Sequence, residues 1–471
     1  MHPHAPAHEP PDPRRWRALA LLGAAQFMLI LDVTVVAIAL PDIGAGLALD
    51  RTQLTWVVTA YTLMFGGLMP LGGRATDLFG ARRLLLVGLT VFTAASLTAG
   101  LAGGAAVLIG ARMLQGAGAA LLSPAALSVV ATAFHGPERN RALGVWAAIG
   151  GTGSAVGVLV GGLLTAGPGW EWIFYVNVPI GLVLLALLPG ALPVTARPTR
   201  RATLDVPGAL LVTAATATTI YGLTNAGDDG WGAPATLVPL AAGLALYAAF
   251  AALQRRSAAP LMDLTLLTRR PVLTGAFLML VATALLISSF FLGSFYLQGP
   301  GGHGPLATGL LFLPVAAGTA LGAHLGGRAI GGVGPRLVAV PALLTAAVGL
   351  AIPAADTGTG TLSLGLSVAS AGLGAGFVAA TTTALAHVSP GEAGLTSGLV
   401  NTCHEFGGAI GVPVVSSIAG SSIAAGHLAG PGGLTDALAF LAVSAAAGAV
   451  AALFLVPAGR PPAGAPTAHL H

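Results

Sequence analysis

The chain has 471 residues, of which 55% are hydrophobic and only 8% are charged. Soluble proteins carry about 25% charged residues, so the composition excludes an ordinary soluble protein and predicts a polytopic membrane protein. The net charge of +4 then comes from loop residues that orient the helices in the membrane, and it does not indicate binding of nucleic acid. All 20 basic residues are arginines. Because the phosphate-binding loop of ATPases requires a lysine, the chain is not itself such an ATPase.

Apolar segments of about 20 residues predict membrane-spanning helices. We predict fourteen of them, at 16–40, 53–73, 83–102, 105–133, 140–166, 171–189, 204–225, 234–253, 272–297, 305–330, 336–354, 360–387, 392–420 and 434–456. The stretches outside them at the two ends, residues 1–13 and 457–471, are rich in His or Pro and are predicted to be disordered tails.

The arginines indicate the orientation of these helices, since short cytoplasmic loops hold most of the positive charge. With both termini in the cytoplasm, only Arg51 falls on the external side, among acidic residues. The cytoplasmic side then holds Arg14, Arg15, Arg17, Arg82, Arg83, Arg139, Arg141, Arg197, Arg200, Arg201, Arg255, Arg256, Arg269, Arg270, Arg336 and Arg460. We therefore predict fourteen spans with both termini cytoplasmic.

An internal repeat divides the chain into two parallel halves. LGGRATDLFGAR, which ends at Arg82, aligns with LGGRAIGGVGPR, which ends at Arg336, with seven of twelve positions identical at an offset of 254. The second and tenth helices therefore correspond, and the seventh and eighth are an insertion. The predicted units are a bundle over 14–195, the inserted helices over 196–260 and a second bundle over 261–456. Parallel halves around a central site are typical of transporters.

The loop after the second predicted helix carries a recognisable pattern. Gly73, Asp77, Gly80, Arg82 and Arg83 form a sequence that resembles the GxxxDxxGRR loop of the major facilitator superfamily. The resemblance implies an all-α membrane protein with two six-helix bundles related by a pseudo-two-fold axis, here with two inserted helices. It also implies that this loop serves gating and stability and does not bind the substrate.

Five further stretches narrow the resemblance to the fourteen-spanning drug:proton antiporters of that superfamily. They are LDVTVVAIALP, TWVVTAYTL, ARMLQGAGAALLSPA, WIFYVNVPIG and GLTSGLVNTCHEFGGAIG. The resemblance covers the first thirteen predicted helices, and the count of fourteen helices agrees with it independently.

Asp32 lies inside the first predicted helix, where a carboxylate is costly and is usually retained for handling ions or substrate. Arg112 and Gln115, three residues apart on the fourth helix, share a face and match the RxxQG motif of the family. At helical rise, Asp32 is about 12 Å and Arg112 about 10 Å from the external helix ends, so the two can pair. The pair is either a permanent salt bridge or one that protonation of Asp32 or cargo binding loosens.

The fifth predicted helix contains a stripe of glycines, Gly153, Gly157 and Gly161, at four-residue intervals. Such a stripe lets another helix approach very closely. It resembles the antiporter motif of proton-coupled exporters, although Val158 stands where that motif has a proline. The expected role is helix packing, and the motif favours antiport over symport.

The thirteenth predicted helix departs most from the family. It has Cys403-His404-Glu405 where the family tends to have Arg-Gln, and this places an acid inside the membrane. Either Glu405 or His404 is a second proton site, or Glu405 only accepts a hydrogen bond. Helical geometry predicts that these two neighbours do not share a face. The expected substrate cavity is lined by Asp32, Gln115, Asn401, His404 and Glu405.

The resemblance implies a proton-coupled antiporter that exports amphipathic drugs or antibiotics across the bacterial inner membrane by alternating access. It is expected to be a monomer in the lipid bilayer, not an enzyme, with proton coupling by Asp32, Arg112 and Glu405. No cofactor or metal is expected, because the proton gradient supplies the energy. A dedicated exporter of one metabolite or self-produced antibiotic remains the alternative. A transport-dead sensor or partner-binding component would leave three costly buried charges without a use.

Overall fold

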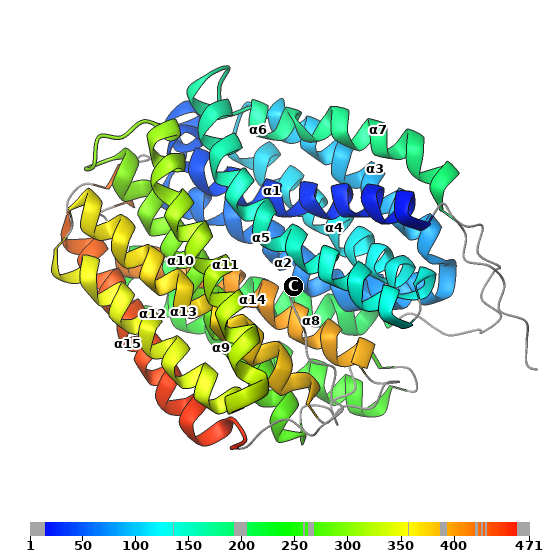
Figure 1. Cartoon of the computed structure of the whole chain (residues 1–471). Helices are drawn as coiled ribbons and strands as arrows, with labels where there is room; N and C mark the ends of the chain where they lie inside the picture. Colours follow the sequence, from blue (N-terminus) through cyan, green and yellow to red (C-terminus); the bar gives the residue numbers. More distant parts are fainter. Residues whose placement is uncertain are drawn as a thin grey trace, which may run out of the picture.

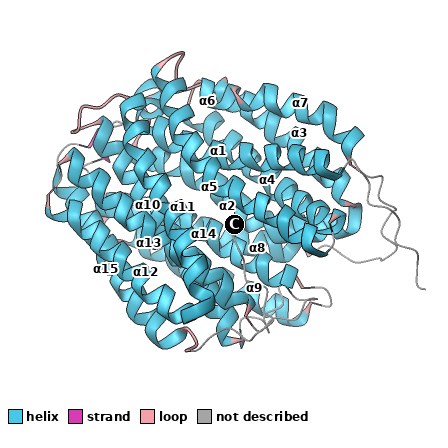
Figure 2. Cartoon of the chain, viewed as in Figure 1, coloured by secondary structure: helices cyan, strands magenta, loops and turns pink. Residues whose placement is uncertain are grey.

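The computed structural model describes residues 15–134, 136–192, 205–257, 260–261, 268–356, 358–386, 393–419, 423–424, 427–428 and 431–458. These residues are almost entirely helical (Figures 1 and 2). The β structure among them is one short antiparallel pair, β1 (Ile423–Ala424) with β2 (His427–Leu428). The predicted N-terminal tail and residues 459–471 of the predicted C-terminal tail lie outside the described residues.

The helices follow the predicted segments closely. They are α1 (Arg15–Leu47), α2 (Arg51–Phe79), α3 (Ala81–Gly100), α4 (Ala105–Ala133), α5 (Gly136–Ala166), α6 (Trp172–Tyr175), α7 (Asn177–Ala191), α8 (Val206–Asp229), α9 (Pro234–Arg256), α10 (Arg270–Gln298), α11 (Pro305–Val333), α12 (Pro335–Ala355), α13 (Thr359–Leu385), α14 (Ala393–Ala419) and α15 (Pro431–Leu455).

Twelve spans within the described residues are long and apolar enough to cross a membrane, with α6 and α7 counted together. The other two predicted segments are α5 and α14, with 31 and 27 residues. All fourteen predicted segments are therefore helices.

Two helices differ from the predicted segments, one in where it ends and one in its continuity. The first was expected to end at residue 40, but α1 continues through Pro41 to Leu47. A membrane helix tolerates proline where neighbouring helices compensate for the lost hydrogen bond. The sixth predicted segment is interrupted at Val176, between α6 and α7.

The two halves of the chain pack alike. In the first half, α1 packs on α5, α2 on α4, and α3 on α4 and α7. In the second half, α10 packs on α14, α11 on α13, and α12 on α13 and α15. The inserted helices α8 and α9 pack on each other, and α8 also contacts α2 and α14. These pairings agree with the predicted repeat and with the all-α fold of two bundles.

The repeated loop docks in the same way in both halves. Gly80 and Gly334, 254 residues apart, both adopt φ +88° at the end of a helix. This conformation favours glycine because it has no Cβ. Arg82 then donates to the carbonyl oxygen of Pro189 at 2.8 Å, and Arg336 to that of Val456 at 2.7 Å. In each half an arginine therefore binds a carbonyl at the end of the sixth helix of its bundle, where cations are favoured.

The two bundles meet closely at one end, which we call the Arg51 end because α2 begins there. Gln298 donates to the carbonyl oxygen of Ile38 at 2.6 Å and thus joins α10 to α1. Arg51 donates to Ser416 Oγ at 3.3 Å and to the carbonyl of Thr224 at 2.8 Å, which joins α2 to α14 and α8.

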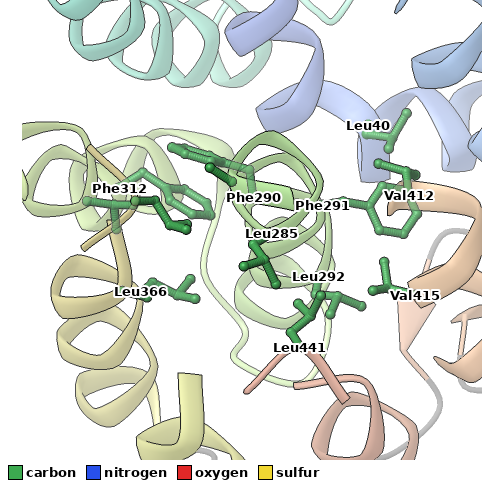
Figure 3. Close-up of a cluster of buried hydrophobic side chains, with 14 of the residues drawn as sticks. Leu40, Leu285, Phe290, Phe291, Leu292, Phe312, Leu366, Val412, Val415 and Leu441 are labelled. Atoms are coloured by element: carbon green, nitrogen blue, oxygen red, sulfur yellow. The ribbon is translucent and has the colours of Figure 1, made fainter. Parts of the chain in front are cut away.

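Apolar packing continues across this contact. Phe291 of α10, Leu40 of α1 and Val412 of α14 belong to one cluster of buried hydrophobic side chains, and Figure 3 shows the three grouped together. Phe290 stacks on Phe312 of α11 with ring centroids 4.8 Å apart. One hydrophobic core therefore spans both bundles at the Arg51 end.

Candidate functional site

Asp32 lies at the centre of a buried polar network in the first bundle. Its side chain is 0% exposed, and its two oxygens accept three hydrogen bonds. Arg112 Nη1 donates to Oδ2, in the ion pair that the matching depths predicted. Gln115 Nε2 and Asn177 Nδ2 each donate to Oδ1 at 2.9 Å. The carboxylate of α1 is thus held by side chains of α4 and α7.

Arg112 is itself held from several sides. Its Nε donates to the carbonyl oxygen of Val57 at 3.1 Å, and its Nη1 donates to Gln115 Oε1 at 3.0 Å. The guanidinium lies 4.4 Å from the centroid of the Tyr61 ring, which favours a buried cation. Since Val57 and Tyr61 both belong to α2, the network joins four helices, α1, α2, α4 and α7, around one ion pair.

Three members of the network could not be recognised as such from the sequence: Asn177, Ser96 and Tyr61. Asn177 is the first residue of α7, directly after the interruption at Val176. Ser96 of α3 accepts a hydrogen bond from Gln115 Nε2 at 2.8 Å. The only signal was indirect, because Asn177 and Tyr61 lie in two stretches that resemble the antiporter branch.

The chemistry of the network suits an ionised carboxylate. Arg112, Gln115 and Asn177 all present N–H groups to Asp32, so both oxygens act as acceptors. Hydrogen bonds from these donors to a charged carboxylate are stronger than those to a neutral carboxylic acid, so protonation would weaken the three contacts. Protonation of Asp32 would therefore loosen the connection of α1 to α4 or α7.

A second polar group lies on α14. His404 Nδ1 is 3.2 Å from Glu405 Oε1, so the two side chains contact each other although adjacent helix positions do not share a face. Rotation of the two side chains about their χ angles brings the terminal atoms together although the Cβ atoms point apart. The Glu405 side chain is 13% exposed and that of His404 is 42% exposed. Asn401, one turn earlier, is exposed.

The five residues expected to line one cavity thus fall into two groups. Asp32 and Gln115 are fully buried in the first bundle, whereas the three residues of α14 are at least partly accessible. α2 lies against both groups, because Tyr61 contacts Arg112 and a Cβ at Gly66 would lie 2.6 Å from that of Glu405.

The glycine stripe of α5 faces α1. A methyl group at Gly153 would lie 2.9 Å from Ile30, and one at Gly161 would lie 2.9 Å from the Cα of Val35. At Gly157 it would collide with Thr34. All three glycines therefore permit the close contact of α5 with the helix that carries Asp32.

The residues of the loop after α2 lie at the opposite end from Arg51. Gly73 and Asp77 lie on the last turns of α2, and Gly80 separates α2 from α3. Arg82 is bound to Pro189 as described above, and Arg83 is exposed. The structure therefore separates this loop from the Asp32 network by several helical turns.

Comparison with known proteins agrees with this architecture. The sequence model of the Major Facilitator Superfamily matches residues 22–412. The puromycin resistance protein pur8 of Streptomyces alboniger is 40% identical over 425 residues, which cover 88% of this chain and 84% of that protein. A cephamycin export protein of Amycolatopsis lactamdurans is 36% identical over 432 residues, which cover 86% and 85%.

A solved structure gives the same result for the fold alone. A crystal structure of a peptide transporter in complex with sulfate superposes with a TM-score of 0.65 at 17% identity, covering 93% of this chain and 94% of that one. The family match, the relatives and the arrangement of helices agree, and the chain belongs to the major facilitator superfamily of membrane transporters.

Proposed function

We propose that this transporter is a proton-coupled antiporter that exports amphipathic drugs or antibiotics across the bacterial inner membrane. The observation that carries the proposal is the sealed Asp32 carboxylate with its three donors, because protonation would remove the charge that strengthens these contacts between helices. A group of this kind converts a proton gradient into a conformational change. The proton gradient is then the only energy source needed, and no cofactor takes part.

Alternating access would operate between the two bundles, over 14–195 and 261–456, with residues 196–260 as an inserted helical pair. Contacts at the Arg51 end support a conformation that is closed there. Asp32 would act on cargo indirectly, through the packing of α1. The accessible groups of α14, Asn401, His404 and Glu405, are the candidates for direct contact with cargo.

Two kinds of cargo selectivity fit this architecture. Relatives named for resistance to puromycin and for export of cephamycin favour a dedicated exporter of one antibiotic. A multidrug exporter would carry chemically unrelated compounds. We expect both kinds of exporter to function as monomers in the bilayer.

The proposal is tested by transport in inside-out membrane vesicles that contain the protein. With an acidic lumen, uptake of puromycin or of ethidium, a flat organic cation, should exceed that of vesicles without the protein. Collapse of the pH gradient with nigericin should remove the difference. Uptake of puromycin alone would support a dedicated exporter. Absence of gradient-dependent uptake for a panel of antibiotics would contradict antiport and favour a transport-dead role.

Orientation provides a separate prediction. We expect both termini to lie in the cytoplasm, because the arginines gather at the end opposite Arg51. Reporter fusions after Pro198 and Ala258 should read cytoplasmic, and a fusion after Asp229 should read external. A cytoplasmic reading at Asp229 would mean that α8 and α9 do not span the membrane.

A further inference from the structure

The hydroxyl of Tyr61 is a polar group of the buried site that the mechanism above does not use. Tyr61 is 0% exposed, and its hydroxyl oxygen has no hydrogen-bond partner in the described part of the chain. Its ring packs on the Arg112 guanidinium, so the ring alone accounts for the contact with the ion pair. A phenylalanine would provide the same ring without burying an unpaired hydroxyl.

An unpaired buried hydroxyl is unfavourable, because it loses its hydrogen bonds to water and gains none in return. Such a group is explained most simply if it gains a partner at another step of the transport cycle. The step at which a proton reaches Asp32 could supply such a partner. Asp32 is 0% exposed and Arg112 is 1% exposed, so a proton needs a polar route to reach the carboxylate.

Tyr61 belongs to α2, the helix that contacts both the Asp32–Arg112 ion pair and the second polar group. Its ring centroid lies 4.4 Å from the guanidinium of Arg112, which pairs with Asp32. Further along α2, Gly66 admits the side chain of Glu405 to close contact with the helix. Glu405 is partly exposed, whereas Asp32 is not. Glu405 is therefore the more accessible of the two acids, and Tyr61 is the hydroxyl on the helix that separates them.

We propose that the Tyr61 hydroxyl relays protons between Glu405 and Asp32. In the relay, protonated Glu405 gives its proton to the Tyr61 oxygen, directly or through one water, while the original hydroxyl proton passes to Asp32. One O–H bond breaks and one forms at the phenol, so Tyr61 remains neutral and one proton moves. The ionisable groups on the helices packed against this part of α2 are Asp32 of α1, Arg112 of α4, and Glu405 of α14 with His404 beside it. The relay rests on the proton coupling proposed above.

Replacement of Tyr61 by phenylalanine tests the relay with little risk to folding, since it removes only an unpaired hydroxyl. In inside-out vesicles, Tyr61→Phe should lower uptake of puromycin driven by an acidic lumen at least about tenfold, as expected for loss of a positioned proton-transfer group. Exchange of labelled for unlabelled puromycin without a gradient should stay within about twofold, because exchange needs no net proton transfer.

The matched control is Tyr247→Phe in α9. Tyr247 is a partly buried tyrosine, but its hydroxyl bonds to Thr216 at 2.7 Å and it lies in the inserted pair. This control loses a hydrogen bond and should still transport as the unmodified protein does. A purely structural effect of losing a hydroxyl would therefore appear in the control.

The dependence on lumen pH provides a second measurement. If proton transfer becomes the slow step in Tyr61→Phe, its uptake should continue to rise with acidity where that of the unmodified protein has reached a plateau. Gradient-driven uptake equal to that of the unmodified protein would overturn the relay and leave antiport intact. An equal loss of driven uptake and exchange would also overturn it, in favour of a structural role. Absence of gradient dependence in the unmodified protein would instead refute the proposed function itself.

Discussion

Replacement of Asp32 by asparagine is expected to abolish uptake of cargo driven by the proton gradient, while exchange of cargo without a gradient remains measurable. Asparagine cannot take up a proton, so the contacts of Asp32 with Arg112, Gln115 and Asn177 can no longer respond to pH. The measurement is initial uptake into inside-out vesicles with and without an acidic lumen. Full gradient-driven uptake by Asp32→Asn would exclude Asp32 as the coupling group.

The same substitution leaves Arg112 buried without its carboxylate. Removing one partner of a buried ion pair costs about 3 to 5 kcal/mol in typical cases, although Val57 and the Tyr61 ring still contact the guanidinium. A double variant, Asp32→Asn with Arg112→Gln, removes both charges. It should regain thermal stability in detergent and remain uncoupled, which separates a folding defect from a coupling defect.

Glu405 provides the comparison on α14. Glu405→Gln should slow gradient-driven uptake but leave it measurable, because Asp32 remains as the coupling carboxylate and a neighbouring imidazole, His404, is still present. If Glu405→Gln abolishes coupling and Asp32→Asn does not, the coupling site lies on α14. Comparison of the two losses of coupling therefore shows which of the two carboxylates is the coupling site, a choice that the sequence alone left open.

The positions of the helices could be predicted because the bilayer dictates the length of an apolar segment. The pairing of Asp32 with Arg112 could also be predicted, since helical rise gives the depth of each residue. The repeat was equally informative, because Gly80 and Gly334 recur at a fixed offset and form the same turn. These features depend on distance along the chain, and the sequence contains that information.

The remaining members of the site depend on how helices are rotated and interrupted. Asn177 reaches Asp32 because of how α7 is rotated about its axis, and an apolar run gives no sign of that rotation. The contact of His404 with Glu405 depends on side-chain rotation, which a rule about helix faces does not include. The separation of the expected cavity into a sealed and an accessible group depends on the position of α2 between them. The rotation of a helix, the rotamer of a side chain and the order in which helices pack are tertiary properties. The pattern of residues along the chain did not predict them.

The contact between α5 and α11 leads to a prediction about conformational exchange. A methyl group at Gly309 would collide with the carbonyl oxygen of Val158, and one at Gly162 would lie 2.7 Å from the carbonyl oxygen of Pro305. Both neighbours are backbone atoms, so they cannot rotate away as a side chain can. Gly309→Ala should therefore force the two bundles apart at the Arg51 end.

Overpacking of this kind costs about 1 to 3 kcal/mol, which corresponds to a shift of roughly 5- to 150-fold between two conformations. Because a transporter must visit both conformations, we expect gradient-driven uptake by Gly309→Ala to fall about tenfold or more. Spin labels on cysteines placed at Gly103 and Gly304, one in each bundle, should report a longer distance. The native Cys403 is replaced by serine for this measurement.

The matched control is Gly331→Ala, the same substitution near the other end of α11. A methyl group there meets nothing within 4 Å, so it should add only the preference of alanine for helix, which is about 0.5 to 1 kcal/mol. The control should therefore keep normal transport and the same distance between the labels. If Gly309→Ala behaves like the control, α5 and α11 do not form the closing contact. If it shifts the label distance and slows transport, closure at the Arg51 end requires the bare backbone of two glycines, because α5 and α11 meet there with no room for a side chain.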